Sequence, residues 1–228
     1  NKINDYKSVI KLIFKLQKIK LKKNYKLGKF KVKFSNYTLD NLHKESDLFF
    51  DWYLKYSLKK KITSKIKRLL RTELNKVYKK LNFKNDTFVH RDFHVSNIMM
   101  DKKKLGLIDN QDAIIGNPLY DVVSLIDDVR IKLPQDLQNK LFKFYYKNSK
   151  YKKEKMKKLI NDFDILSVQR NLKILGIFVR LSKRDNKHNY LKYLPYTWLL
   201  IERRMKNPIF NKLNILFNKY LPLKKSII

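Results

Sequence analysis

The sequence predicts an α+β protein in which a few short strands lie among many helices. Apolar residues recur at helical spacing on both sides of a shorter central part, residues 87–108, which carries short β-type runs separated by a turn. The chain has 228 residues, of which 43% are hydrophobic and 13% aromatic, enough for a substantial core. We therefore expect one compact domain covering residues 1–228, with room for two subdomains, and no internal repeat or domain linker is recognisable.

Three helices are expected before the central part. Residues 5–20 place apolar side chains on one helical face, and Asp5 is a plausible cap. A basic stretch up to Asn36 is predicted to be turn-rich. Two further helices are then expected at residues 39–56 and 63–81.

Short strands are expected next, at residues 87–89, 97–100 and 105–108, with a turn at residues 101–104. Gly116-Asn117-Pro118 marks a further turn, after which helices resume. The expected helices are residues 120–129, 134–147, 163–181, 189–204 and 208–220, and residues 147–158 form a charged surface segment.

The charge of the chain is strongly positive, with 54 Lys and Arg against 20 Asp and Glu, a net charge of +34. Such a charge is typical of nucleic-acid or membrane-surface binding. However, 45 of the basic residues are lysines scattered along the chain. Proteins that recognise nucleic acids more often use arginine, which binds phosphate through two hydrogen bonds. We therefore interpret the lysines as a solvated surface and do not expect a nucleic-acid partner.

No apolar run is long enough to span a membrane, and no signal peptide is recognisable. Disulfides are excluded because the chain has no cysteine. A cytoplasmic location is the default expectation. The oligomeric state cannot be predicted.

Asp92, Asn97 and Asp109 form the most informative pattern, because they follow the order that a phosphoryl-transfer site needs. Asp92 lies on a loop between two predicted strands and is the candidate catalytic base that orients a substrate hydroxyl. Asn97 and Asp109 supply hard oxygen ligands of the kind that Mg²⁺ prefers. His90 is expected to support the loop backbone. His94 either contacts substrate or phosphate or is structural, and both alternatives remain open.

These residues carry a family resemblance. The chain resembles the aminoglycoside phosphotransferase and choline kinase superfamily, whose fold is similar to protein kinases, through residues 90–97, 107–113 and 116–121. It is most similar to the bacterial anomeric N-acetylmuramate/N-acetylglucosamine kinases of cell-wall recycling, through residues 109–113 and 120–125, the Gln169–Leu181 run, and Glu45 with residues 48–54.

The resemblance implies a mostly helical, protein-kinase-like C-terminal lobe that binds ATP and Mg²⁺. It implies transfer of the γ-phosphate of ATP to the anomeric hydroxyl of an N-acetylated amino sugar, with a structural role for Asp121. Sugar-contacting residues carried over in the same way are Glu45, Gln111, Asp112, Arg170 and Arg180. For Gln111 and Asp112 the alternative is a loop-supporting role, and for the two arginines it is surface salt bridges.

Two departures from the family pattern stand out. Asn110 replaces the usual Phe beside the metal aspartate. With Gly28, Gly106, Gly116 and Gly176 as its only glycines, the sequence has no Gly-rich nucleotide loop. Since it also starts with Asn1 and not Met, we expect a fragment from which the N-terminal nucleotide lobe is absent. Two alternatives stay open: a kinase of another small hydroxyl compound, of the aminoglycoside or choline type, and an inactive lobe that acts as a basic binding module.

Overall fold

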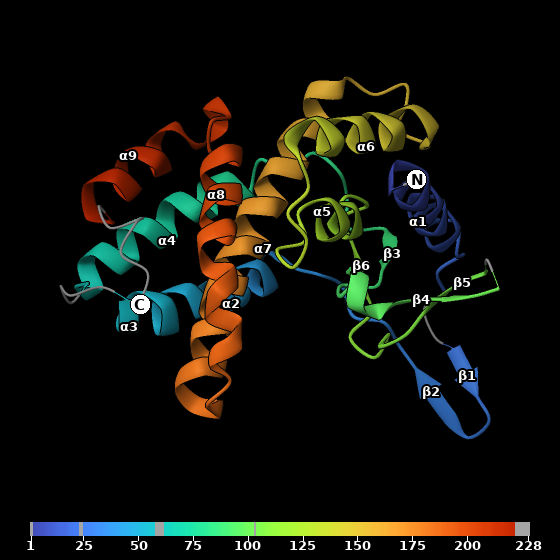
Figure 1. Cartoon of the computed structure of the whole chain (residues 1–228), viewed down its shortest axis with the longest axis horizontal. Helices are drawn as coiled ribbons and strands as arrows, with labels where there is room; N and C mark the ends of the chain where they lie inside the picture. Colours follow the sequence, from blue (N-terminus) through green and yellow to red (C-terminus); the bar gives the residue numbers. More distant parts are fainter. Residues whose placement is uncertain (1, 23–24, 58–61, 103, 222–228) are drawn as a thin grey trace. The chain divides into compact units, whose positions relative to one another are not determined.

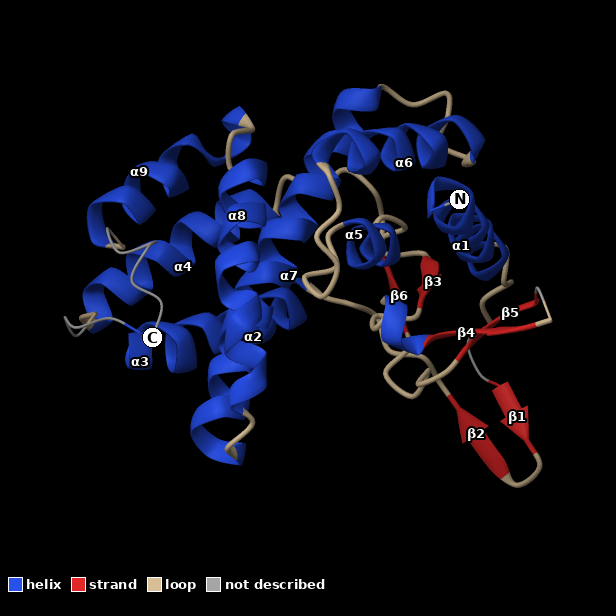
Figure 2. Cartoon of the chain, in the orientation of Figure 1, coloured by secondary structure: helices blue, strands red, loops and turns tan. Residues whose placement is uncertain are grey.

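Helices form most of the chain, and the strands are short (Figure 1, Figure 2). The computed structural model describes residues 2–22, 25–57, 62–102 and 104–221. Within this part, the chain divides into two compact units. The first unit contains the described residues of Asn1–Thr38 and Asn82–Phe163, and the second contains those of Leu39–Leu81 and Asp164–Ile228.

The described part of the first unit contains three α-helices, the start of a fourth and three small sheets. Helix α1 (Lys2–Gln17) packs against α5 (Tyr120–Ile126), α6 (Gln135–Asn148) and β3 (Thr87–Val89). Ile10 and Ile13 of α1 are fully buried, which stabilises the fold by about 1.5–3 kcal/mol for each side chain. The start of α7 (Met156–Asp185) also belongs to this unit.

All three described sheets have two antiparallel strands. Strand β1 (Tyr25–Leu27) pairs with β2 (Phe30–Val32), and β4 (Ile98–Asp101) pairs with β5 (Lys104–Leu107). Strand β3 pairs with the distant β6 (Ile114–Gly116), with Val89 opposite Ile114. Strand β3 ends directly before the predicted catalytic loop, and β4 begins directly after it. Because each of these strands is paired, both ends of the loop are fixed.

The second unit is helical in its described part. It contains α2 (Leu39–Leu48), η1 (Phe49–Leu54), α3 (Lys55–Ser57), α4 (Ser64–Tyr78), the remainder of α7, η3 (His188–Tyr193), α8 (Leu194–Arg204), η4 (Pro208–Phe210) and α9 (Asn211–Tyr220). Helix α4 packs against both α2 and α9. An aromatic cluster forms its core, in which Phe49 stacks on Tyr53 and the Trp198 indole N–H donates to the Tyr53 hydroxyl at 2.6 Å.

Most of the expected elements are confirmed, with ends that shift by a few residues. The helix expected at residues 163–181 begins earlier, at Met156, and ends later, at Asp185. It therefore takes in part of the segment that was expected to be a charged surface stretch.

The structure differs from the expectations at five further places. The basic stretch before Asn36 contains the β1–β2 hairpin, and the strand β6 was missed. The helix expected at residues 39–56 is α-helical only to Leu48 and then widens to the π-helix η1. The helices expected at residues 189–204 and 208–220 each begin as a 3₁₀ helix.

Among the described residues, no helix is both long enough and apolar enough to cross a bilayer.

Candidate active site

The predicted catalytic loop lies in the first unit, between β3 and β4. It begins at His90, immediately after β3, and ends with the 3₁₀ helix η2 (Val95–Asn97), which leads directly into β4. The buried Phe93 anchors the middle of the loop and meets the His90 ring edge-on at 6.1 Å. The loop therefore has a fixed shape, with Asp92 on the half-buried part of it.

Asp121, in the first turn of α5, fixes the start of the loop. Its buried carboxylate accepts the backbone N–H groups of His90 at 2.8 Å and Arg91 at 3.0 Å. Arg91 has a φ of 77°, in the left-handed region, which costs a non-glycine residue about 1–3 kcal/mol. Two hydrogen bonds to a charged group contribute about 1.5–3 kcal/mol each, enough to offset that cost. Asp121 thus stabilises the turn that precedes Asp92.

Asp128 binds the loop farther along. One of its carboxylate oxygens accepts the Val95 N–H at 3.3 Å, and the other accepts the Arg130 N–H at 3.0 Å and lies 3.3 Å from Nη1 of the Arg130 side chain. Asp128 is almost fully buried. The two aspartates therefore bind backbone amides on both sides of Asp92.

His90 connects the loop to the segment that carries Asp109. Its ring is buried, and its Nε2 lies 3.1 Å from the backbone oxygen of Ile108, which can only accept, so Nε2 donates. Burial lowers the pKa of His90 below its usual value, although the Ile108 carbonyl and the nearby Asp92 and Asp109 act in the opposite direction. A neutral ring that is bonded in this way suits a supporting role better than proton transfer.

Asp92 and Asn97 are joined through the loop backbone. The Asp92 carbonyl accepts the His94 N–H and the Asn97 side-chain N–H, each at 3.0 Å. Because the Asn97 side-chain nitrogen faces the Asp92 carbonyl, the side-chain oxygen of Asn97 points away from it. That oxygen bonds to none of the described residues. Asn97 is 8% exposed, so an unused oxygen at this position is available to a ligand that enters the site.

Asp109 lies two residues after the end of β5, close to Asn97 at the start of the paired strand β4. Ile98 pairs with Leu107, and the Ile108 N–H donates to the Asn97 carbonyl at 3.1 Å, which places Asp109 one residue beyond the pairing. Its φ is 65° and its side chain is exposed. An amide oxygen and a carboxylate fit Mg²⁺, which usually takes one or two protein oxygens together with water and phosphate oxygens. Among the described residues, no group of three or more His, Asp or Glu side chains gathers as a metal site.

The other predicted residues of this unit lie on exposed or partly exposed backbone. His94 precedes η2, and its carbonyl accepts the Asn97 N–H at 2.9 Å. Gln111 and Asp112 are exposed in a turn that an Asn110–Ala113 backbone hydrogen bond closes at 3.1 Å. Asn110 is itself exposed, so the departure from the family pattern places a polar residue at a surface position.

Three predicted sugar-contacting residues belong to the second unit. Glu45 is buried and binds Lys173 at 2.9 Å and the Gln169 amide N–H at 3.0 Å. Arg170 is 5% exposed, and its Nη1 has no hydrogen-bond partner among the described residues. Nε of the half-buried Arg180 also has none. Surface salt bridges therefore do not account for Arg170.

Two supporting residues escaped the sequence prediction. One is Asp128. The other is Asp162, a fully buried carboxylate that accepts N–H groups from Asn82 and Asn117 at 2.8 Å and from Phe83 at 3.0 Å. Asn117 in turn accepts the Leu119 N–H, at the start of α5.

Much of the chain matches a known protein family. The model of the phosphotransferase enzyme family matches residues 26–156, which include the whole loop, β4, β5 and α5. The chain belongs to this family. The match covers more than half of the chain and confirms the family resemblance that the loop motif predicted.

Named relatives in this family are N-acetylmuramate/N-acetylglucosamine kinases. The chain is 31% identical to the one from Neisseria meningitidis serogroup B over 163 residues, covering 70% of this chain and 49% of that protein. It is 30% identical to the one from Pseudomonas aeruginosa over 165 residues, covering 71% of this chain and 49% of that protein. The chain thus spans about half the length of these curated relatives.

A solved structure also resembles the chain. A choline/ethanolamine kinase family protein from Mesorhizobium loti superimposes with a TM-score of 0.59 at 14% identity, covering 96% of this chain and 68% of that chain. At this identity the likeness concerns the fold alone, and it confirms the predicted α+β, kinase-like class.

Proposed function

We propose that the complete protein is an ATP-dependent kinase that phosphorylates the anomeric hydroxyl of N-acetylmuramate or N-acetylglucosamine, in the cytoplasm and as part of cell-wall recycling. The observation that carries the proposal is a pair of hydrogen bonds at Asn97: its side-chain N–H donates to the Asp92 carbonyl, and its own carbonyl accepts the N–H of Ile108, the residue before Asp109. The names of the relatives support the choice of sugar.

In this proposal Asp92 accepts a hydrogen bond from the sugar hydroxyl and takes its proton as the phosphoryl group transfers. An anomeric hydroxyl is more acidic than an ordinary alcohol, so an aspartate with a weakly basic carboxylate is sufficient. Asn97 and Asp109 would bind Mg²⁺, which supplies positive charge for the phosphate oxygens of ATP. Asp121, Asp128 and His90 keep the loop in the shape that aims Asp92.

The test is the substitution Asp92→Asn in the complete protein. It preserves the size of the side chain and removes the proton acceptor, so we expect the rate of sugar 1-phosphate formation to fall by about 10²–10⁴-fold, the usual contribution of a general base. The measurement is ATP-dependent production of sugar 1-phosphate, with each sugar as acceptor.

Asp136→Asn is the matched control. Asp136 is exposed in the first turn of α6, so this substitution makes the same chemical change away from the loop. The control should retain full activity. Undiminished sugar 1-phosphate production by Asp92→Asn would refute the assignment. If the protein phosphorylates an aminoglycoside or choline but neither sugar, the proposed acceptor is wrong, while the proposed catalytic role of Asp92 stands.

A further inference from the structure

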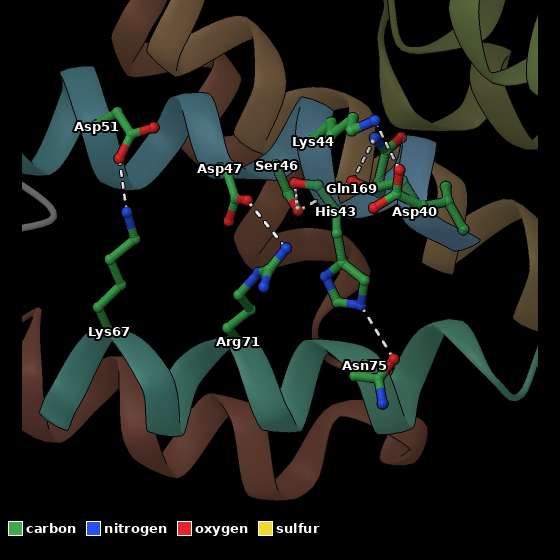
Figure 3. Close-up of polar contacts among 11 residues, drawn as sticks. Asp40, His43, Lys44, Ser46, Asp47, Asp51, Lys67, Arg71, Asn75 and Gln169 are labelled. Carbon is green, nitrogen blue, oxygen red and sulfur yellow. Dashed lines mark hydrogen bonds and ion pairs between the residues drawn. The ribbon is translucent and has the colours of Figure 1, made fainter. Parts of the chain in front are cut away.

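A groove in the second unit lies between α2 and α4 and is unrelated to the residues proposed for catalysis. Figure 3 shows the side chains that face one another across the two helices. The groove is open to solvent and has a volume of about 480 Å³, within the range of about 300–1,000 Å³ that is typical of small-molecule sites. Its polar lining consists of Asp40, His43, Arg68, Arg71, Thr72 and Asn75.

The positive charge of the groove exceeds its negative charge. Arg68 and Arg71 are three residues apart on α4 and therefore share one face of the helix. The Arg71 guanidinium pairs with Asp47 at 3.1 Å, and the Asp40 carboxylate pairs with Lys44 at 2.8 Å. Each of these two carboxylates thus already has a cation. Arg68 is exposed and makes no ion pair or hydrogen bond with the described residues, so its charge remains available.

The choice of arginine is itself informative. Only nine of the 54 basic residues are arginines, and two of the nine line this groove. An arginine binds phosphate or carboxylate through two parallel hydrogen bonds, whereas a lysine acts as a point charge. On a surface where lysine is the common cation, two neighbouring arginines favour recognition of an anion with planar or multiple oxygens.

Three further polar side chains complete the lining: His43, Thr72 and Asn75. His43 is 9% exposed, its Nε2 lies 3.0 Å from the Asn75 side-chain oxygen, and its Nδ1 has no hydrogen-bond partner among the described residues. In Figure 3 the ring lies between the two helices, with Nδ1 on the side of Arg71. The Asn75 amide nitrogen bonds to none of the described residues, so its N–H donors, with the Thr72 hydroxyl, can meet hydroxyl groups of a ligand.

We propose that this groove is a binding site for a small hydroxylated anion, either a phosphate ester or a carboxylate. Arg68 and Arg71 contact the anionic group. Thr72, Asn75 and the Asp40 carboxylate contact the hydroxyl groups. The inference does not depend on the kinase reaction, because none of the residues assigned to that reaction lines the groove.

The test uses the complete protein and three probes at about 0.15 M salt: glucose 6-phosphate, gluconate and glucose. We expect glucose 6-phosphate, gluconate or both to bind, with amide NMR shifts in α2 and α4, and glucose to bind much more weakly. Binding of glucose 6-phosphate alone identifies a phosphate site, and binding of gluconate alone a carboxylate site. Binding of neither anion, or binding of glucose with equal affinity, would overturn the proposal.

Two variants separate the groove from the general positive charge of the chain. Arg68→Gln should weaken anion binding about tenfold or more, because it removes a charge-assisted hydrogen bond. Arg184→Gln makes the same charge change on the exposed end of α7 and should leave the affinity unchanged. An equal loss in both variants would mean that the anion binds only to the net charge. Both sites are exposed, so circular dichroism should show an unchanged fold.

Discussion

At the scale of single residues, the predicted catalytic loop combines candidate reactive side chains with buried aspartates that support its backbone. Asp92 and Asp109 are recognisable in the sequence because their types and spacing match a reaction. Asp121 was implied only by resemblance, and Asp128 was not recognised at all. Both aspartates act on backbone N–H groups that any residue possesses, so their partners leave no mark in the sequence.

Buried tyrosines give a second property of individual residues. Burial raises the pKa of Tyr53, Tyr78 and Tyr145 above the ordinary value of 10.0, because the phenolate is poorly solvated inside the protein. The unfolded chain loses these protons near pH 10 and the folded chain retains them. The free energy of unfolding should therefore fall as pH rises above about 10, while below pH 10 these groups have no effect.

A spectrophotometric titration at 295 nm would measure this difference. In the folded protein, at least three of the 14 tyrosines should ionise later than the rest, together with unfolding. In denaturant, all 14 should titrate near pH 10. A single transition of all tyrosines near pH 10 in the folded protein would contradict the prediction.

At the scale of elements, the errors of the sequence prediction have physical causes. The β1–β2 hairpin turns at Gly28, whose φ of 57° suits a two-residue hairpin turn. Apolar residues alternate with lysines on both sides of this glycine, a pattern from which the hairpin could have been predicted. Strand β6 was not recognisable, because its partner β3 lies far away in the sequence and three residues carry too little pattern.

The junction of α2 with η1 depends on a close helix contact. A Cβ atom at Gly176 of α7 would lie 2.3 Å from the backbone of Leu48, where α2 ends. Gly176→Ala must therefore push the two backbones apart, and we expect it to lower the free energy of unfolding by about 1–3 kcal/mol, as overpacking usually does. Urea unfolding measures the change.

Gly106→Ala is the matched control. A Cβ atom at Gly106 meets no atom within 4 Å, and the backbone there has no positive φ. The stability of this variant should stay within about 0.5 kcal/mol of the parent protein. Equal losses in the two variants, or no loss in Gly176→Ala, would show that the contact between α7 and Leu48 does not restrict the side chain.

At the scale of the whole molecule, the net charge of +34 should oppose compaction. Salt shortens the range of this repulsion, from about 30 Å at 0.01 M to about 8 Å at 0.15 M. We therefore expect the urea unfolding midpoint to rise between these two concentrations of NaCl. KCl should act equally, because screening depends on ionic strength. A midpoint that falls or stays constant would show that attractive ion pairs, and not repulsion, dominate the charge of the fold.

The sequence alone determined the fold class, most helices and the residue types of the predicted catalytic loop, since these depend on local periodicity and on the chemistry of side chains that are close in sequence. The resemblance of residues 90–97, 107–113 and 116–121 to known kinases also indicated the family, which the family match confirms. Only the tertiary structure decided which side chains support that loop, where β3 finds its partner, and that α2 and α4 enclose a groove lined by two arginines. Those features depend on contacts between residues that are far apart in the sequence. Such contacts form only when the folded chain packs closely, so a local sequence pattern does not predict them.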